Sequence, residues 1–290
     1  MVRIIENLAE VANDYDAVFC DLWGCLHNGI TAFPEAVDAL RAFRTDGGKV
    51  VLLTNAPRPR ADVEKQLDGM GVPRDCWDTI ATSGDSARAA MFRGVVGNKV
   101  WFMGEDRDLT FFEPIKLVDD PVEIERVPLD QAEGIVCLGA FDAKADPAVN
   151  RPEFLYAKTK GLKLLCANPD IVVDRGETRE WCAGALAQLY TEMGGESLYF
   201  GKPHPPVYDL ARRRLADLGT DIPDNRILAI GDGINTDIMG ALGEDLDSLF
   251  ITGGLAAAET RTERQPDPQA LEAFLSGHQI APTFAVGFLR

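Results

Sequence analysis

Short apolar runs alternate along the chain with segments in which apolar residues recur at helical spacing. A short continuous apolar run is typical of a buried strand, and helical spacing predicts an amphipathic helix. Because strands and helices alternate, the pattern favours a mostly parallel sheet with helices on both faces. The strands expected in this sheet are Ala17–Leu22, Lys49–Thr54, Thr79–Ala81, Leu198–Phe200, Arg226–Ile230 and Ser248–Ile251.

Helices are expected between these strands, at Pro34–Thr45, Arg60–Gly69, Pro205–Leu218 and Thr236–Leu242. A second set of strands is expected in the middle of the chain, at Val100–Met103, Gly134–Leu138 and Leu162–Ala167. We therefore predict an α/β fold with two domains. Residues 1–87 and 182–290 would form a core with a Rossmann-like parallel sheet, and residues 88–181 a second α/β domain inserted into it.

The chain is strongly acidic, with 46 Asp and Glu against 29 Lys and Arg and a formal net charge of -17. Such a chain is repelled by a phosphate backbone, so we expect no nucleic-acid partner. No apolar run approaches the roughly 20 residues that span a bilayer, so we expect no membrane partner. The six cysteines form no CxxC pair and are typical of buried, reduced thiols, which predicts a cytoplasmic protein.

Polar residues that could carry chemistry stand directly after four of the expected strands. In an open parallel sheet, ligands collect at the carboxyl ends of the strands. We therefore expect these side chains to meet on one rim of the core sheet. The residues are Asp21, Thr54 with Asn55, Lys202, and Asp232 with Asp237.

The chemistry that this set predicts is phosphoryl transfer. A carboxylate such as Asp21 can attack phosphorus and form an aspartyl-phosphate intermediate. Two carboxylates beside a phosphoryl group need a screening cation, and oxygen ligands point to Mg²⁺. Lys202 would neutralise the phosphate, Thr54 would donate a hydroxyl hydrogen bond, and backbone amides around Asn55 would surround the oxygens. The expected partner is a small phosphorylated substrate.

Each part of this set has a plainer interpretation when taken alone. An aspartate after a strand is often a helix cap, and a lysine before prolines is usually a solvated loop residue. The "GDGIN" stretch that contains Asp232 is also typical of a turn. Four such segments in this order, each following a strand, favour the interpretation as a site.

Four segments resemble the four motifs of the haloacid dehalogenase-like (HAD) hydrolase superfamily. They are "DLWGCLHNG", "LLTNAPRPR", "FGKPHPPVYDLA" and "AIGDGINTDIMGA". The similarity is closest to the NagD-like and p-nitrophenyl phosphatase-like subfamily, IIA, which has a large α/β cap, and it covers nearly the whole chain. The resemblance implies a phosphatase whose cap at residues 88–181 covers the pocket and selects the substrate. Caps of this class often take part in dimer contacts, so a homodimer is a further expectation.

The resemblance also implies roles for individual residues. Asp21 would be the nucleophile. The Mg²⁺ ligands would be Asp21, the backbone carbonyl of Trp23, Asp232 and Asp237. The phosphoryl group would be bound by Thr54, Asn55 and Lys202.

The chain departs from the family pattern at Trp23, where family phosphatases usually carry a second Asp that protonates the leaving oxygen and then activates water. An indole can do neither. General acid–base help is worth roughly 10²–10⁴-fold, so the loss should be greatest for poor leaving groups such as alkyl alcohols. His27, His204 and Asn28 are the candidates near enough in sequence to act as a substitute.

This departure leaves three interpretations open. In the first, the chain is a Mg²⁺-dependent phosphohydrolase that favours good leaving groups or uses a substitute acid. In the second, it is a catalytically weakened binder of phosphorylated ligands. In the third, it is a dehalogenase, since those enzymes also carry an aromatic residue two positions after the nucleophile. Dehalogenases use no Mg²⁺ and lack the paired acids, so Asp232 and Asp237 argue against carbon–halogen chemistry.

Overall fold

The structure is a computed structural model that describes residues 2–175 and 178–290. The chain forms two compact units. The larger comprises Met1–Thr54, Glu64–Ala81 and Lys202–Arg290, and the smaller comprises Asn55–Val63 and Thr82–Gly201. The smaller unit therefore begins before the predicted cap at residues 88–181 and ends after it. The cap bounds, as a functional domain, stay a prediction.

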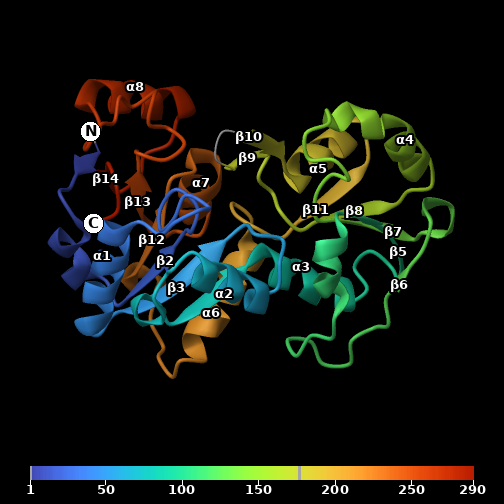
Figure 1. The fold of residues 1–290 in the computed structure, drawn as a ribbon, viewed down its shortest axis with the longest axis horizontal. Helices are drawn as coiled ribbons and strands as arrows, with labels where there is room; N and C mark the ends of the chain where they lie inside the picture. The colour runs from blue at the N-terminus through green and yellow to red at the C-terminus, as the bar shows by residue number, and fades with distance from the viewer. Residues whose placement is uncertain (1, 176–177) are drawn as a thin grey trace. The chain divides into compact units, whose positions relative to one another are not determined.

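The larger unit is built on a seven-stranded sheet in the order β1-β14-β13-β12-β2-β3-β4 (Figure 1). The strand pairs from β1 to β3 in this order are all parallel. This confirms the predicted α/β class with a parallel core sheet. The strands are β1 (Arg3–Ile4), β2 (Ala17–Cys20), β3 (Lys49–Thr54), β4 (Thr79–Thr82), β12 (Ile227–Gly231), β13 (Asp247–Ile251) and β14 (Phe284–Val286).

The order of these strands creates a switch point beside β2. The chain runs from β2 to β3 and β4 on one side, and later returns to β12, β13 and β14 on the other. Strands β12 and β2 therefore lie side by side, with Ile230 paired to Cys20. In open α/β sheets, the crevice at the carboxyl ends of two such strands is where ligands bind.

The helices of this unit follow the apolar spacing of the sequence. In α1 (Pro34–Thr45), proline stands at the first turn, where its missing N–H costs no hydrogen bond, and Val37, Leu40 and Phe43 are buried. In α6 (Pro205–Ala216), the buried face packs against residues of β2, β3 and β12. The other helices are α2 (Arg60–Gly69), which crosses the boundary between the units, α7 (Met239–Gly243) and α8 (Pro268–His278).

The smaller unit has its own five-stranded parallel sheet, in the order β11-β8-β7-β5-β6. A two-stranded antiparallel hairpin, β9 and β10, completes it. The strands are β5 (Lys99–Met103), β6 (Glu125–Arg126), β7 (Gly134–Cys137), β8 (Lys163–Cys166), β9 (Val172–Arg175), β10 (Thr178–Trp181) and β11 (Glu196–Tyr199). The helices are α3 (Ser83–Phe92), α4 (Arg151–Thr159) and α5 (Ala183–Glu192).

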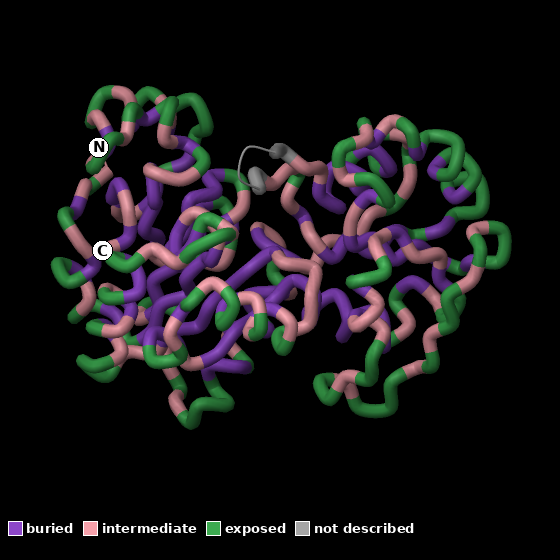
Figure 2. Tube along the Cα trace, in the orientation of Figure 1, coloured by how far each residue is buried: buried purple, intermediate pink, exposed green. Residues whose placement is uncertain are grey.

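Alternate residues of β7 and β8 enter two different cores of the smaller unit. Ile135 and Leu164 pack in a cluster with residues of α4 and α5, whereas Val136 and Leu165 pack in a cluster with residues of α3. This is the alternation expected when helices cover both faces of a sheet. Figure 2 shows the buried positions following the strands of both sheets.

One predicted strand lies in the wrong sheet. The run Leu198–Phe200 was expected in the core sheet, but it corresponds to β11, which pairs with β8 of the smaller unit. An apolar run shows that a strand is buried without showing which sheet it joins.

Within the described residues, no helix combines the length and apolarity needed to cross a membrane.

Candidate active site

The centre of the seven-stranded sheet places three candidate residues at neighbouring strand ends. Asp21 follows β2, Asp232 follows β12, and Thr54 ends β3. The Asp21 backbone N–H donates to the Ile230 carbonyl at 2.8 Å, which extends the pairing of β2 with β12 up to the aspartate. All three side chains are buried. The predicted rim at the switch point is therefore formed by adjacent strands.

Lys202 lies in this unit just before α6 and joins two of the candidate acids. Its Nζ donates to Asp21 Oδ1 and to Asp237 Oδ1, both at 2.6 Å, and its side chain is only 3% exposed. Burial alone would lower the pKa of this amine. The charges of Asp21 and Asp237 and the two hydrogen bonds outweigh burial, so the pKa of Lys202 lies well above its ordinary value. The lysine is therefore a fixed positive charge beside Asp21.

Asp232 is buried against the backbone of two glycines. A Cβ on Gly24, whose φ is +77°, would lie 2.2 Å from Asp232 Oδ2, and one on Gly254 would lie 2.0 Å from the same atom. The Leu255 backbone N–H donates to this oxygen at 3.0 Å. Burial raises the pKa of Asp232 well above its usual range, and the charges of Asp21 and Asp237 raise it further.

Asp237 is held by the turn that follows β12. Residues Ile234–Ile238 form one π-helical turn, a form that is frequent at functional sites, and α7 begins after it. The carboxylate reaches back within this turn, because the Gly233 backbone N–H donates to Asp237 Oδ2 at 3.0 Å. The expected helix Thr236–Leu242 is thus a π-turn followed by a short α-helix.

The charges gathered here favour a bound cation. Three carboxylates, from Asp21, Asp232 and Asp237, face one ammonium group, so two negative charges are in excess when all are ionised. Ligand atoms of Asp21, Asp232 and Cys25 all lie within 4.8 Å of one another. Carboxylate oxygens in such a cluster suit Mg²⁺, and the donor set therefore fits this ion.

Cys25 is the residue of this cluster that the sequence did not single out. All six cysteines are free and buried, as predicted, and Cys25 alone belongs to the described cluster that could hold a metal ion. The signal that could have found Cys25 is its position four residues after Asp21 in the loop that returns past the rim. Thiolates prefer softer ions than Mg²⁺, so this side chain would widen the choice of metals.

The loop after Asp21 fixes the indole of Trp23. A Cβ on Gly29, whose φ is +82°, would lie 2.2 Å from Cη2 of Trp23, so the ring packs directly on this glycine. The Trp23 and His27 rings meet edge to face, with centroids 5.5 Å apart. The indole is therefore held between a glycine that has no room for a side chain and a buried imidazole.

Two of the three candidate substitute acids make hydrogen bonds within the loop, and burial lowers the pKa of both histidines. The Nδ1 atom of His27 accepts a hydrogen bond from the Gly29 N–H at 3.0 Å, and burial lowers the pKa of this imidazole to about 4. The side-chain oxygen of Asn28 accepts from two backbone N–H groups of the same loop at 3.0 and 2.9 Å. Burial also lowers the pKa of His204. At neutral pH neither histidine is a charged acid.

Asn55 belongs to the smaller unit, unlike the preceding Thr54. Its side-chain Nδ2 donates to Asp170 Oδ1 at 2.8 Å within that unit. The predicted site residues therefore belong to different units. The larger unit brings together Asp21, Lys202, Asp232 and Asp237, with Thr54 at an adjacent strand end, and Asn55 belongs to the smaller unit.

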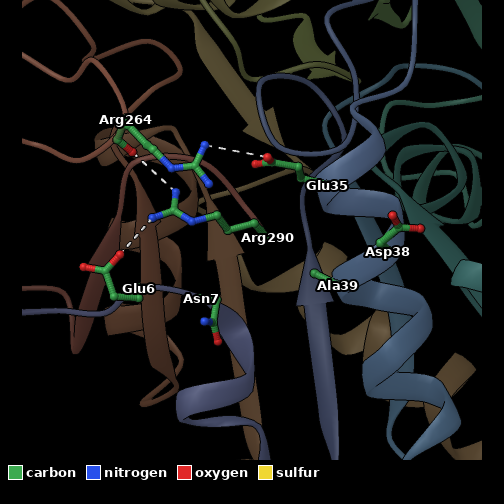
Figure 3. Close-up of a pocket in the computed structure, with 7 residues that line it drawn as sticks. All are labelled: Glu6, Asn7, Glu35, Asp38, Ala39, Arg264 and Arg290. Carbon is green, nitrogen blue, oxygen red and sulfur yellow. Dashed lines mark hydrogen bonds and ion pairs between the residues drawn. The ribbon is translucent and has the colours of Figure 1, made fainter.

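A separate surface pocket of about 500 Å³ lies in the larger unit, and no predicted site residue lines it. Figure 3 shows two arginines there, each directed at a glutamate. A guanidinium nitrogen of Arg264 lies 3.7 Å from Oε1 of Glu35, and one of Arg290 lies 3.5 Å from Oε2 of Glu6. Because each positive charge is matched by a negative one, the pocket is a poor site for a phosphate.

Two family profiles match the chain. One, described as haloacid dehalogenase-like hydrolase, matches residues 18–116, and the other, described as HAD-hydrolase-like, matches residues 199–274. A solved hydrolase of the haloacid dehalogenase-like family from Brucella suis 1330 is 35% identical to this chain. The similarity covers 99% of this chain and 100% of that one, with a TM-score of 0.85.

More distant relatives are similar over most of their length. Ribonucleotide monophosphatase NagD of Escherichia coli K12 is 22% identical over 244 residues, which are 83% of this chain and 89% of the relative. The fold also resembles that of glycerol phosphate phosphatase from Mycobacterium tuberculosis, solved in complex with magnesium. That chain is 22% identical, with a TM-score of 0.63 over 84% of this chain and 70% of its own.

Proposed function

Because this chain belongs to the haloacid dehalogenase-like hydrolase family, in its NagD-like group, we propose that it is a Mg²⁺-dependent phosphatase that acts through an aspartyl-phosphate on Asp21. The single observation that carries the proposal is the position of Lys202. Its Nζ lies 2.6 Å from both Asp21 and Asp237 at the switch point of the sheet. A buried carboxylate beside a fixed positive charge is suited to attack a phosphate.

In the first step an oxygen of Asp21 attacks phosphorus, and the bond from phosphorus to the leaving oxygen breaks. In the second step water attacks phosphorus and releases inorganic phosphate, which restores the carboxylate. Lys202 orients Asp21 and attracts the phosphoryl oxygens, which become more negative as the attack proceeds. Thr54, at the end of β3, would donate its hydroxyl to the same oxygens, and Asn55 would contribute to phosphoryl binding.

The acidic cluster would hold the metal ion. Its ligands would be Asp21, the backbone carbonyl of Trp23 and Asp232, with Asp237 as a further ligand or as a residue that orders the ion's waters. Bound Mg²⁺ would screen the phosphoryl oxygens from the carboxylates. The donor set supports this assignment, and so does the magnesium complex of the mycobacterial phosphatase with a similar fold.

The substrate would be a small phosphorylated metabolite, such as a sugar phosphate or a nucleotide-like molecule. The activity named for the Escherichia coli relative, a ribonucleotide monophosphatase, supports this class. The cap at residues 88–181 would select among such molecules. The hydrogen bonds of His27 and Asn28 and the lowered pKa of His204 support a preference for good leaving groups, because none of the three is a charged acid at neutral pH. A cytoplasmic location and a homodimer stay predictions.

One alternative has a specific observation in its favour. The rigid packing of Trp23 on Gly29 puts an indole where a proton donor would be useful, so the chain would also suit a weakened binder of phosphorylated ligands. Such a binder would hold Mg²⁺ and phosphate without turnover. The two functions therefore differ in product release and agree in ligand binding.

The test is release of p-nitrophenol from p-nitrophenyl phosphate with and without Mg²⁺. We expect Mg²⁺-dependent release that Asp21→Asn abolishes. Asp68→Asn is a matched control, because Asp68 is an exposed aspartate of the same unit, on α2. Release that survives in Asp21→Asn would refute the proposed mechanism. Binding of Mg²⁺ without turnover of any substrate in a broad phosphorylated panel would favour the binder.

A further inference from the structure

We propose that hydrolysis of phospho-Asp21 is the slow step of the cycle, so that the phosphorylated protein accumulates during turnover. This inference rests on the proposed function and goes beyond it. The two chemical steps differ in what they need. Departure of a good leaving group needs no proton, whereas water must lose a proton as it attacks phosphorus. The side chains around Asp21 in the larger unit decide which groups could accept that proton.

The two acids nearest to Lys202 and Asp21 are engaged. Asp237 accepts from Lys202 Nζ through one oxygen at 2.6 Å and from the Gly233 N–H through the other at 3.0 Å. Asp232 accepts from the Leu255 N–H at 3.0 Å and belongs to the cluster suited to a cation. Lys202 is itself a donor to two carboxylates. A carboxylate that took up the water proton would weaken the contacts it now makes, and Lys202, an ammonium group, has no lone pair to offer.

The loop after Asp21 offers no replacement. Trp23 carries only an indole N–H, which is a donor and cannot accept a proton. The lone pair of His27 Nδ1 already accepts the Gly29 N–H at 3.0 Å, and the residue is only 2% exposed. The indole of Trp23 packs on Gly29, so the residue two positions after Asp21 places an aromatic ring against this glycine. Among the described residues of this loop, no side chain is placed to act as a base.

Each step of the cycle forms one bond to phosphorus and breaks another. An Asp21 oxygen bonds to phosphorus, and the leaving oxygen departs with its electron pair as an anion such as p-nitrophenolate. A water oxygen then bonds to phosphorus, the bond from Asp21 to phosphorus breaks, and the water proton passes to solvent. Without a base in the loop after Asp21, the second step lacks the roughly 10²–10⁴-fold that general catalysis from this loop would supply. The first step, with a good leaving group, loses much less.

The experiment is rapid-quench kinetics of the full chain with saturating p-nitrophenyl phosphate and Mg²⁺. We expect a burst of p-nitrophenol close to one equivalent per site, followed by slow turnover. Acid-quenched protein should carry covalent phosphate at a similar level. The covalent phosphate separates a slow chemical step from slow release of bound inorganic phosphate.

Two variants of Trp23 isolate the missing base, because aspartate and asparagine have nearly the same shape. Trp23→Asp should raise the steady-state rate by about 10²-fold and lower the phosphorylated fraction. Trp23→Asn is the shape-matched comparison, and it should raise the steady-state rate much less than Trp23→Asp does. If both variants speed turnover equally, the effect would come from removing the indole, and the inference would be wrong.

The outcomes also separate this inference from the proposed function. Linear release of p-nitrophenol without a burst, on protein that carries no covalent phosphate, would overturn the inference and leave the phosphatase intact. That result would show that another part of the chain supplies a base. Absence of both release and covalent phosphate in the wild type would overturn the proposed function, and the inference with it.

Discussion

His27 provides a quantitative test of the loop that holds Trp23. In the folded protein, burial lowers the pKa of His27 from 6.5 to about 4, while Nδ1 accepts the Gly29 N–H. The unfolded chain binds a proton near pH 6.5, and the folded chain excludes it until the pH falls towards 4. Stability contributed by this residue is therefore present above pH 6.5 and is lost as the pH falls through this window.

The size of the effect follows from the shift. A change of about 2.5 units corresponds to about 3 kcal/mol in total, of which about 2 kcal/mol is lost between pH 7 and pH 5. His27→Asn keeps an acceptor for the Gly29 N–H but cannot be protonated. Its free energy of unfolding should therefore fall by about 2 kcal/mol less than that of the wild type over the same pH interval.

The assay is urea unfolding followed by tryptophan fluorescence at pH 7 and pH 5, with EDTA present. His278→Asn is the control, because His278 is exposed on α8. Since the chain has three histidines, their NMR resonances can also be assigned by substitution and titrated directly. Equal losses for His27→Asn and the wild type, or a His27 resonance that titrates near pH 6.5, would refute the burial argument.

Three further predictions concern the acidic cluster. Lys202→Met should lower the free energy of unfolding by about 3–5 kcal/mol without metal, because it leaves buried carboxylates unpaired, and Mg²⁺ should recover part of the loss in urea unfolding. Gly24→Ala should raise the Mg²⁺ concentration needed for half-maximal activity, because its Cβ would meet a carboxylate, whereas Gly71→Ala, with φ +75° and nothing within 4 Å, should not. Cd²⁺ should give an ultraviolet thiolate-to-metal absorption band that Cys25→Ala removes and Cys76→Ala keeps. A band that persists in Cys25→Ala would show that Cd²⁺ binds away from the cluster of Asp21, Cys25 and Asp232.

The fold was most predictable where sequence pattern and local chemistry agree. The helices Pro34–Thr45 and Arg60–Gly69 and the strand Lys49–Thr54 have the predicted bounds. In the first helix, a proline at the start and apolar residues at helical spacing mark the element without tertiary information. The sheet joined by β11 was not predictable in this way, because it depends on pairing with a strand more than thirty residues earlier.

The candidate site, like the fold, was predictable from the sequence only in part. The order of the motifs predicted the meeting of Asp21 with Lys202, which lie 181 residues apart, because parallel strands bring their carboxyl ends to one edge. Cys25 was missed because a lone cysteine outside any CxxC pair looks like a buried structural thiol. The assignment of Asn55 to the smaller unit was equally invisible, since it follows Thr54 without any break in the pattern.

The packing around Trp23 was not predictable from the sequence either. His27 and Gly29 lie at the end of the first motif and look like ordinary loop residues in the sequence. Only the structure shows that Gly29 packs under the indole and that His27 meets it edge to face. The physical reason is that such contacts depend on the path of the loop, which no local pattern encodes. The departure from the family pattern at Trp23 was visible in the sequence, but the packing of its indole was not.

The most direct test of the central claim is a crystal structure with Mg²⁺ and beryllium fluoride, which mimics a phosphoryl group on aspartate. We expect beryllium bonded to an oxygen of Asp21, fluorides in contact with Lys202 and Thr54, and Mg²⁺ held by Asp21 and Asp232. Beryllium fluoride bound away from Asp21, or Mg²⁺ bound without Asp232, would refute the proposed phosphorylation of Asp21.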